Sequence, residues 1–267
     1  MVNCIVTGTA GRMGRRIVDI LIETEGADVT GATERPGHDI IGMDIGDYLG
    51  LGKKGAAIAD NLASVAGAGD VVIDFTLPDV SARHIMAAVD AGKAMVIGTT
   101  GFDEKGLAQI SEASSKIPIV FAPNMSVGVN LLLKVLHDIA SVLDEDYDID
   151  IVETHHRHKK DAPSGTALKM AQVVAAGRGR DLDEVGVFTR HGIIGERKRG
   201  EIGVQTLRIG DVVGEHTVIF GTMGERIEIT HKASSRDVFA RGAVKAALWV
   251  AGMKPGLYNM HDVLGIK

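Results

Sequence analysis

The segment of residues 153–166, with the sequence ETHHRHKKDAPSGT, is the richest part of the chain in groups that transfer protons. Three of the ten histidines lie within four residues, and two lysines follow them directly. Histidine titrates near neutral pH, so it can accept or donate a proton there. Lysine can donate a proton or neutralise a carboxylate. This composition indicates acid–base chemistry beside an anionic group.

The end of the same segment predicts the start of a helix. Ser164 is of a type that caps helices, and the free N–H groups of Gly165 and Thr166 would then point at an anion. One short stretch therefore offers proton donors beside an anion-binding helix start. That combination suits a small substrate that bears carboxylates.

The same histidine cluster allows two other interpretations. A metal site is disfavoured, because no cysteine accompanies the histidines and consecutive side chains of an extended segment point to opposite faces. We therefore predict no metal. A solvated basic loop without a ligand stays open on these residues alone.

A glycine-rich turn near the start of the chain predicts a dinucleotide site. Residues 3–7 (NCIVT) are typical of a buried strand, and Gly8, Gly11 and Gly14 follow before a helical pattern over residues 15–25. Glycines let the backbone turn sharply and let a pyrophosphate approach, and the helix N-terminus presents N–H groups to it. The spacing G-x-x-G-x-x-G is a variant of the usual fingerprint, and a turn without a ligand is the alternative.

The residues at the end of the second predicted strand bear on the choice of cofactor. Glu34 lies 20 residues after Gly14, where an acid bonds the adenosine ribose of NAD. Arg35 follows, and an arginine there can accept the 2′-phosphate of NADP. The pair predicts use of both NADH and NADPH, unless Arg35 is only a solvated surface charge.

Two further loops follow predicted strands at the sheet edge where ligands bind in open α/β folds. They are residues 98–102 (GTTGF) and 122–126 (APNMS). Each taken singly is more typical of an ordinary loop than of a ligand contact.

The alternation of short apolar strands with amphipathic helices over residues 1–126 predicts a parallel sheet of βαβ units. Beyond residue 126 the pattern changes to a long helix and then to strands with period-2 alternation over residues 186–232. A last helix is expected over residues 236–252. The predicted class is α/β, with a domain boundary near Ser126.

Composition excludes several classes of function. The net charge of −6 and the aromatic content of 4% argue against nucleic-acid binding. The apolar runs are shorter than the ~20 residues that cross a bilayer, so no membrane segment is expected. The single cysteine cannot form an internal disulfide, and a cytoplasmic location fits it.

Four motifs together resemble one enzyme family. GTAGRMG, GTTGF, APNMSVGVN and above all ETHHRHKKDAPSGTA are similar to 4-hydroxy-tetrahydrodipicolinate reductases, also called dihydrodipicolinate reductases, of lysine biosynthesis. The resemblance covers essentially the whole chain; the glycine turn is weakly specific and the histidine run highly specific. The departures are small: Met125 stands where the family often has Phe, and Thr9-Ala10 varies within the turn.

The resemblance implies a role for each matching residue. His155 would be the catalytic acid/base and Lys159 the proton donor, while His156, Gly165 and Thr166 would contact the substrate carboxylates. Glu34 and Arg35 would bind the adenosine ribose and the NADP phosphate. The other implied cofactor-binding residues are Gly8, Thr9, Ala10, Gly11, Arg12, Met13, Gly98, Thr99, Thr100, Ala122, Pro123, Asn124 and Met125.

The resemblance also implies an architecture and a reaction. A Rossmann-like dinucleotide-binding domain would comprise residues 1–126 and 236–267. A smaller inserted α+β domain, residues 127–235, would carry the substrate site and a homotetramer interface. The reaction would be the NAD(P)H-dependent reduction of a small cyclic dicarboxylate in the diaminopimelate route. Two rivals remain, a sensor of NAD(P)H without catalysis and a dehydrogenase that acts on an alcohol.

Overall fold

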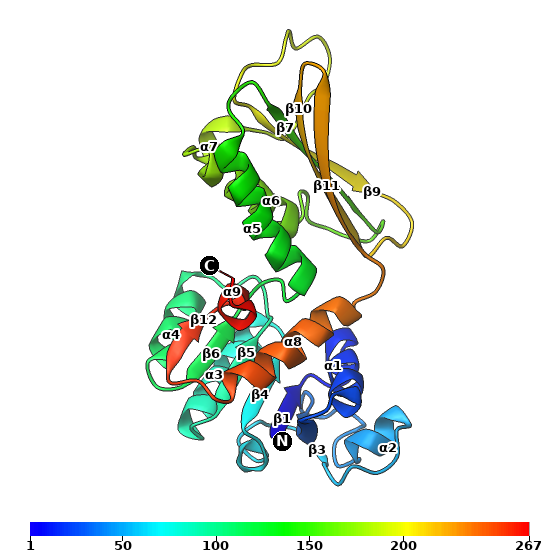
Figure 1. The fold of residues 1–267 in the computed structure, drawn as a ribbon. Coiled ribbons are helices and arrows are strands. Elements are labelled where there is room, and N and C mark those ends of the chain that lie inside the picture. Colours follow the sequence, from blue (N-terminus) through cyan, green and yellow to red (C-terminus); the bar gives the residue numbers. More distant parts are fainter. Residues whose placement is uncertain (267) are drawn as a thin grey trace. The chain divides into compact units, whose positions relative to one another are not determined.

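The computed structural model describes residues 1–266, and these residues form two compact units (Figure 1). Unit 1 comprises Met1–Val127 together with the chain from Arg236 onward, and unit 2 comprises Gly128–Ser235. The chain therefore leaves unit 1 once, builds unit 2 from a single continuous segment, and returns.

Unit 1 is built on a parallel sheet with the strand order β12-β6-β5-β4-β1-β2-β3. The central strands are buried on both faces, which explains why their sequences are apolar throughout. The strand order reverses between β1 and β4, so a crevice is expected at the carboxyl ends of these two strands. The strands are β1 (Val2–Thr7), β2 (Ala27–Thr33), β3 (Ile58–Ala59), β4 (Val71–Asp74), β5 (Ala94–Ile97), β6 (Pro118–Phe121) and β12 (Gly256–Tyr258).

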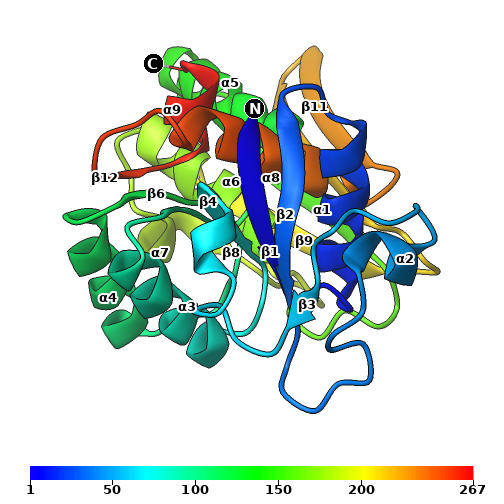
Figure 2. The ribbon, with the colours of Figure 1, turned by 90° about the horizontal axis from the view of Figure 1, so that it is seen from below.

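Helices cover both faces of this sheet (Figure 2). Helices α1 (Arg12–Glu23) and α8 (Asp237–Val250) pack on one face in a core with Cys4 and Val6 of β1. Helices α3 (Pro78–Asp90) and α4 (Glu104–Ser114) pack on the other, in a core with Ile5. Successive strand residues thus feed opposite cores. The short elements are α2 (Ile45–Leu49), η1 (Ala66–Ala68) and α9 (Met260–Leu264).

Helix α8 belongs to unit 1 although more than 100 residues separate it from α4, the helix of this unit that ends at Ser114. Arg16 on α1 makes a two-bond ion pair with Asp237 at the start of α8, at 2.7 and 2.8 Å. Gly242 of α8 lies so close to the chain after β6 that a Cβ there would be 1.8 Å from the carbonyl oxygen of Met125. Close backbone packing therefore anchors the returning helix.

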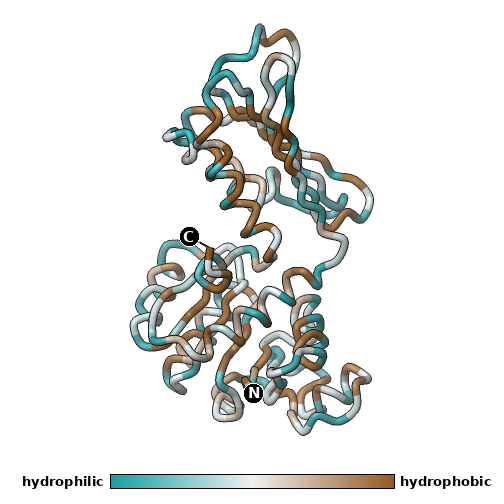
Figure 3. The backbone as a smooth tube through the Cα atoms, viewed as in Figure 1, coloured by the Kyte–Doolittle hydropathy of each residue, from teal (hydrophilic) through white to brown (hydrophobic). Residues whose placement is uncertain are grey.

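Unit 2 is a mixed five-stranded sheet with the order β11-β10-β7-β9-β8. β10 is antiparallel to both of its neighbours, whereas β7, β9 and β8 run parallel. The helices α5 and α6 bury apolar side chains against one face of this sheet, and apolar residues run along α5 in Figure 3. The elements are α5 (Val127–Val142), β7 (Asp148–His155), α6 (Gly165–Gly177), α7 (Leu182–Val185), β8 (Gly186–Val187), β9 (Ile202–Arg208), β10 (Gly214–Thr222) and β11 (Glu225–Ala233).

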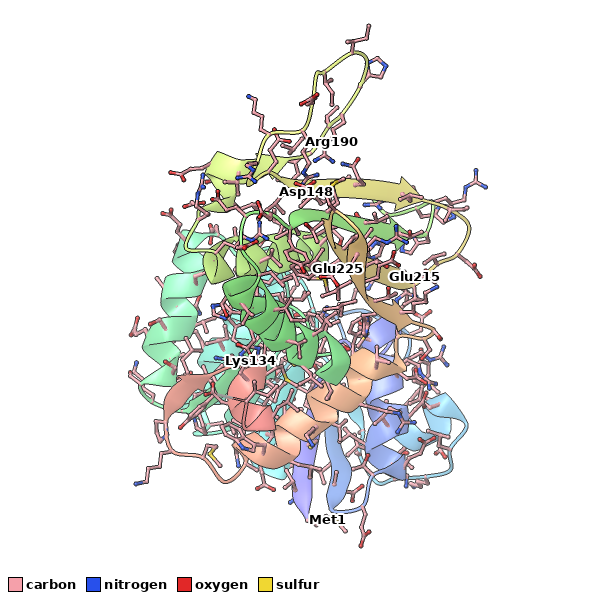
Figure 4. All side chains as sticks on the ribbon, turned by 45° about the horizontal axis from the view of Figure 1, so that its top comes forward. Met1, Lys134, Asp148, Arg190, Glu215 and Glu225 are labelled. Atoms are coloured by element: carbon pink, nitrogen blue, oxygen red, sulfur yellow. The ribbon has the colours of Figure 1, made fainter. Side chains whose placement is uncertain are left out.

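The start of the strand-rich stretch expected over residues 186–232 is the main error of the sequence-based assignment. Only Gly186–Val187 pair as β8, and the chain then leaves the sheet as a long loop. Arg190 bonds the Asp150 carboxylate at 2.6 Å, and Arg197 also binds that carboxylate, so ion pairs rather than strand pairing hold this loop. Figure 4 shows Arg190 and Asp148 at the base of the loop. The short elements α2, β3, β12 and α9 were also not foreseen.

Candidate active site

The glycine turn between β1 and α1 has the geometry of a backbone cradle. Gly8 has a φ of +64°, a conformation that disfavours side chains. A Cβ at Gly14 would lie 2.2 Å from the Gly8 carbonyl oxygen, so only glycine lets α1 begin against this turn. The turn is further held by Thr9, whose N–H and hydroxyl both donate to the Thr33 carbonyl at 3.1 and 3.2 Å. Gly11 and Arg12 are exposed at the mouth of the turn.

Glu34 binds the glycine turn directly. Its carboxylate accepts from the Ala10 N–H at 2.8 Å and from the Arg35 N–H at 2.9 Å. The Arg35 side chain is exposed. The acid and the cation therefore stand together beside the turn, where the ribose end of a dinucleotide would lie.

The loops after β5 and β6 each contain both buried and exposed residues. Gly98 is buried, and a Cβ there would lie 2.2 Å from the Phe75 ring. Thr99 is buried as well, whereas Thr100 is exposed. In the loop after β6, Ala122 and Met125 are buried, Pro123 is exposed and Asn124 is half-buried.

These burial differences separate side-chain from backbone roles. The side chain of Met125 packs in the core of unit 1, so a ligand would meet this residue only through its backbone. The Asn124 carboxamide oxygen accepts from the Ser126 N–H at 2.9 Å, which holds that loop in place.

In unit 2, the fully buried Glu153 on β7 organises the histidine segment. Its Oε1 accepts from the Ser164 N–H at 2.9 Å and its Oε2 lies 2.5 Å from Nδ1 of His155. Arg208 on β9 forms a bidentate pair with both carboxylate oxygens, at 2.9 and 3.0 Å. Burial alone would raise the pKa of Glu153, but the bonds from Arg208, His155 and Ser164 outweigh it and lower this pKa.

The His155 ring is held by a hydrogen bond between its Nδ1 and the Glu153 carboxylate. Because the Glu153 carboxylate can only accept, Nδ1 carries the proton of their bond. The other nitrogen, Nε2, faces Gly214, where a Cβ would lie 3.0 Å from it. Burial lowers the pKa of His155, and the bond to Glu153 opposes that effect in part. The imidazole is therefore fixed in orientation and favours the neutral form.

Lys159 stands at the rim of this cluster. Its ammonium group lies 2.9 Å from Asp161, and its side chain is 21% exposed. Its N–H donates to the His156 carbonyl at 3.1 Å, so a tight turn carries both residues. The His156 and His158 rings lie 6.3 Å apart. An accessible cation thus stands beside a buried, oriented imidazole.

The helix start predicted at Ser164 is present as the start of α6. Ser164 caps the helix, because its Oγ accepts from the Ala167 N–H at 3.1 Å. Gly165 and Thr166 are the first two residues of the helix. A Cβ at Gly165 would meet nothing within 4 Å, so space is open there.

Two residues that hold this cluster were not foreseen. Arg208 lies 55 residues from Glu153, and only the parallel pairing of β7 with β9 brings it there. His216 on β10 is buried, and its Nε2 lies 3.1 Å from the Ser164 Oγ. Burial is the main cause that lowers its pKa to about 4. A histidine on the same face of the strand as the buried Val218 and Phe220 was the one signal available.

Among residues 1–266, no three His, Cys, Asp or Glu side chains are grouped so as to hold a metal ion. The three adjacent histidines do not converge on one point, since His155 turns toward Glu153 inside the sheet.

Comparison with known families decides the relationship. The description "Dihydrodipicolinate reductase, N-terminus" matches residues 2–125, and "Dihydrodipicolinate reductase, C-terminus" matches residues 128–264. The chain belongs to the dihydrodipicolinate reductase family. The resemblance stated from the four motifs is thereby confirmed.

Known members of the family match this chain over its whole length. The 4-hydroxy-tetrahydrodipicolinate reductases of Syntrophus aciditrophicus and Hahella chejuensis are 54% and 53% identical, and each alignment covers 100% of both chains. A dipicolinate-bound dihydrodipicolinate reductase from Paenisporosarcina sp. TG-14 is 25% identical, with a TM-score of 0.74 and 97% of each chain covered. An amine dehydrogenase from Mycobacterium smegmatis, at 12% identity and a TM-score of 0.62, shares the fold alone.

These findings also confirm the α/β class with a Rossmann-like sheet, and they make the enzyme one that uses a pyridine nucleotide. No helix within residues 1–266 is both long and apolar enough to span a bilayer.

Proposed function

We propose that this reductase converts 4-hydroxy-tetrahydrodipicolinate to tetrahydrodipicolinate, with either NADH or NADPH as reductant. Water leaves the hydroxy substrate, hydride adds to C4 of the resulting cyclic imine, and a proton completes the reduction. The observation that carries this proposal is the buried Glu153–His155 pair beside Lys159 and the open start of α6. It joins proton donors to a carboxylate site in a chain of this family.

The cofactor half of the site is proposed for unit 1. The glycine turn fits a pyrophosphate, because side chains at Gly11 and Gly14 would fill the space around the Gly8 carbonyl. Glu34 would take the adenosine ribose and exposed Arg35 a 2′-phosphate, which supports use of both cofactors. When bound there, the reduced nicotinamide supplies the hydride. The loops of residues 98–100 and 122–125 would line its ring.

The substrate half is proposed for unit 2. The N–H groups of Gly165 and Thr166, with His156, would bind the carboxylates, and the cationic Lys159 would offset their charge. His155 would exchange a proton through Nε2, since Nδ1 is engaged by Glu153. Lys159 would donate the proton to the enamine that hydride addition creates. The residues proposed to bind the carboxylates thus all belong to one segment, residues 156–166.

Assembly and location are proposed on the resemblance. We expect a homotetramer in the cytoplasm, with the interface on unit 2. Exposed apolar side chains on its sheet, among them Leu207 and Ile227, support an interface there. Analytical ultracentrifugation would measure the mass in solution, and a monomer would contradict this assembly.

The first test is substitution of Lys159. General acid catalysis contributes about 10²–10⁴-fold, so Lys159→Ala should lower kcat by that order while NADH affinity is kept, because the glycine turn is untouched. The measurement follows absorbance of the reduced cofactor with substrate made by the preceding synthase. Lys160→Ala, an exposed neighbour, is the matched control and should match the wild type.

Two outcomes would contradict the proposal. A Lys159→Ala enzyme within threefold of wild-type kcat would remove Lys159 from the mechanism. A wild-type protein that binds NADH without turning over this substrate would be a nucleotide sensor or a reductase of another compound. Pyridine-2,6-dicarboxylate should inhibit the reaction, since it presents two carboxylates on a similar ring.

A further inference from the structure

A buried carboxylate stands at the carboxyl end of β4, in unit 1, apart from the histidine segment. Asp74 is fully buried and accepts from the Thr76 N–H at 2.8 Å, the Thr76 hydroxyl at 2.7 Å and the Thr99 hydroxyl at 3.2 Å. Nδ1 of His84, on α3, lies 2.6 Å from its other oxygen. These four residues are called the Asp74 cluster below.

Core packing alone does not explain a carboxylate at this position. Removing a charge from water is costly unless hydrogen bonds satisfy it, and the three residues before Asp74 in β4 are apolar and equally buried. An apolar side chain would fill the strand end without that cost. The acid is instead matched to donors from three separate segments, namely the loop after β4, the loop after β5 and helix α3.

The Asp74 cluster is also in contact with the glycine turn. A Cβ at Gly8 would lie 3.1 Å from the Thr76 methyl carbon, so Thr76 lies against the turn that is expected to hold the pyrophosphate. The Thr99 hydroxyl is 3.3 Å from the Thr76 carbonyl oxygen, which joins the loops after β4 and β5 to each other. One carboxylate therefore ties together the loops that follow β4 and β5, and Thr76 of the first loop lies beside the turn after β1.

The strand order of the sheet indicates which part of a bound dinucleotide would lie over these loops. A bound pyrophosphate would lie at the turn after β1, and Glu34, which follows β2, would mark the adenosine side. The nicotinamide must then extend to the opposite side of the switch point, over the carboxyl ends of β4 and β5. The Asp74 cluster lies directly beneath those ends.

We propose that Asp74 and His84 are positioning residues for the nicotinamide half of the cofactor site. His84 fixes the Asp74 carboxylate, and Asp74 in turn holds Thr76 and Thr99 so that the two loops present a preformed surface to the ring. Neither residue touches the reacting atoms. The inference rests on the proposed function only in that a nicotinamide dinucleotide binds unit 1.

The test compares two ligands that differ only in the nicotinamide. His84→Leu removes the group that holds Asp74, whereas His84→Asn keeps a donor close to the place of Nδ1. We expect His84→Leu in the full-length protein to raise the Kd of NADH about fivefold or more, measured by fluorescence, and to change the Kd of ADP-ribose less than twofold, measured by calorimetry. His84→Asn should restore the wild-type ratio. His137→Leu, an exposed histidine 3.6 Å from Asp138, is the control and should leave both constants unchanged.

Other outcomes overturn the proposal. Equal weakening of NADH and ADP-ribose by His84→Leu would show a general role in folding, and so would failure of His84→Asn to restore the ratio. Unchanged binding of both ligands would show that the cluster positions nothing. Because these constants are measured without substrate, they stand apart from the turnover assay. A wild type that binds NADH but fails that assay contradicts the proposed function and leaves this inference intact.

Discussion

At the scale of single residues, buried partners set the orientation and the ionisation state of the active-site candidates. His155 is oriented because Glu153 accepts from its Nδ1, and Glu153 stays ionised because Arg208 holds both of its oxygens. Removal of one member would leave a buried charge without its partner, which costs far more than the pair contributes. The cluster therefore acts as a unit.

Arg35→Ala should weaken NADPH more than NADH. The 2′-phosphate would lose a charge-assisted partner worth about 1.5–3 kcal/mol, whereas Glu34 would still serve the ribose of NADH. Michaelis constants for both cofactors at low salt measure the effect. Arg241→Ala, exposed on α8, is the control. Equal changes for the two cofactors would mean that Arg35 is only a surface charge.

His216 should make the fold less stable in mild acid. Its pKa is lowered from 6.5 to about 4, chiefly by burial, so the unfolded chain binds a proton that the folded one refuses. Above pH 6.5 the histidine is neutral in both states and does not affect the free energy of unfolding. Between pH 6.5 and about 4 that free energy falls, because only the unfolded chain binds the proton. By pH 4.5 the loss is about 2–3 kcal/mol.

His216→Gln isolates this titration, because Gln keeps a polar group near the place of Nε2. Urea unfolding at pH 7.5 and 4.5 should show a smaller acid-induced loss for His216→Gln, by about 2 kcal/mol. The same loss in both proteins would show that His216 does not titrate as described.

At the scale of elements, the glycine turn depends on the contact between α1 and β1. Gly14→Ala would place a Cβ 2.2 Å from the Gly8 carbonyl oxygen, where backbone on both sides leaves no room. Such overpacking costs about 1–3 kcal/mol or more and shifts the N–H groups of the turn. We expect lower thermal stability and at least tenfold weaker NADH binding.

Gly67→Ala is the matched control for Gly14→Ala. Its Cβ would meet nothing within 4 Å, and its φ lies outside the left-handed region. Melting temperature and NADH titration should therefore be close to the wild type. A Gly14→Ala protein with normal NADH affinity would show that this turn is not the pyrophosphate site.

At the scale of the whole molecule, we propose that the cofactor binds unit 1 and the substrate binds unit 2, and hydrogen exchange can test that division. NADH alone should protect the amides of residues 8–14 in unit 1. Adding pyridine-2,6-dicarboxylate should then protect those of residues 164–167 in unit 2. Protection by the dicarboxylate in unit 1 only would contradict the assignment of the carboxylate site to α6.

Local patterns were enough to predict much of this protein. The glycine turn, the apolar strands and the helix start at Ser164 are set by short-range rules of backbone geometry and burial, so residues near in sequence reveal them. The family followed from the run ETHHRHKKDAPSGTA, because a long motif of uncommon residues rarely arises twice. The functions of the individual residues remain predictions.

Only the tertiary structure showed what holds the candidate site together. Arg208 and His216 reach the histidine segment through strand pairing across more than 50 residues, and His84 meets Asp74 where helix α3 packs on the sheet. The loop after β8 was misread as a strand, because its ion pairs to Asp150 come from a distant element. Such contacts are decided by which elements pack together, and a local pattern does not contain that information.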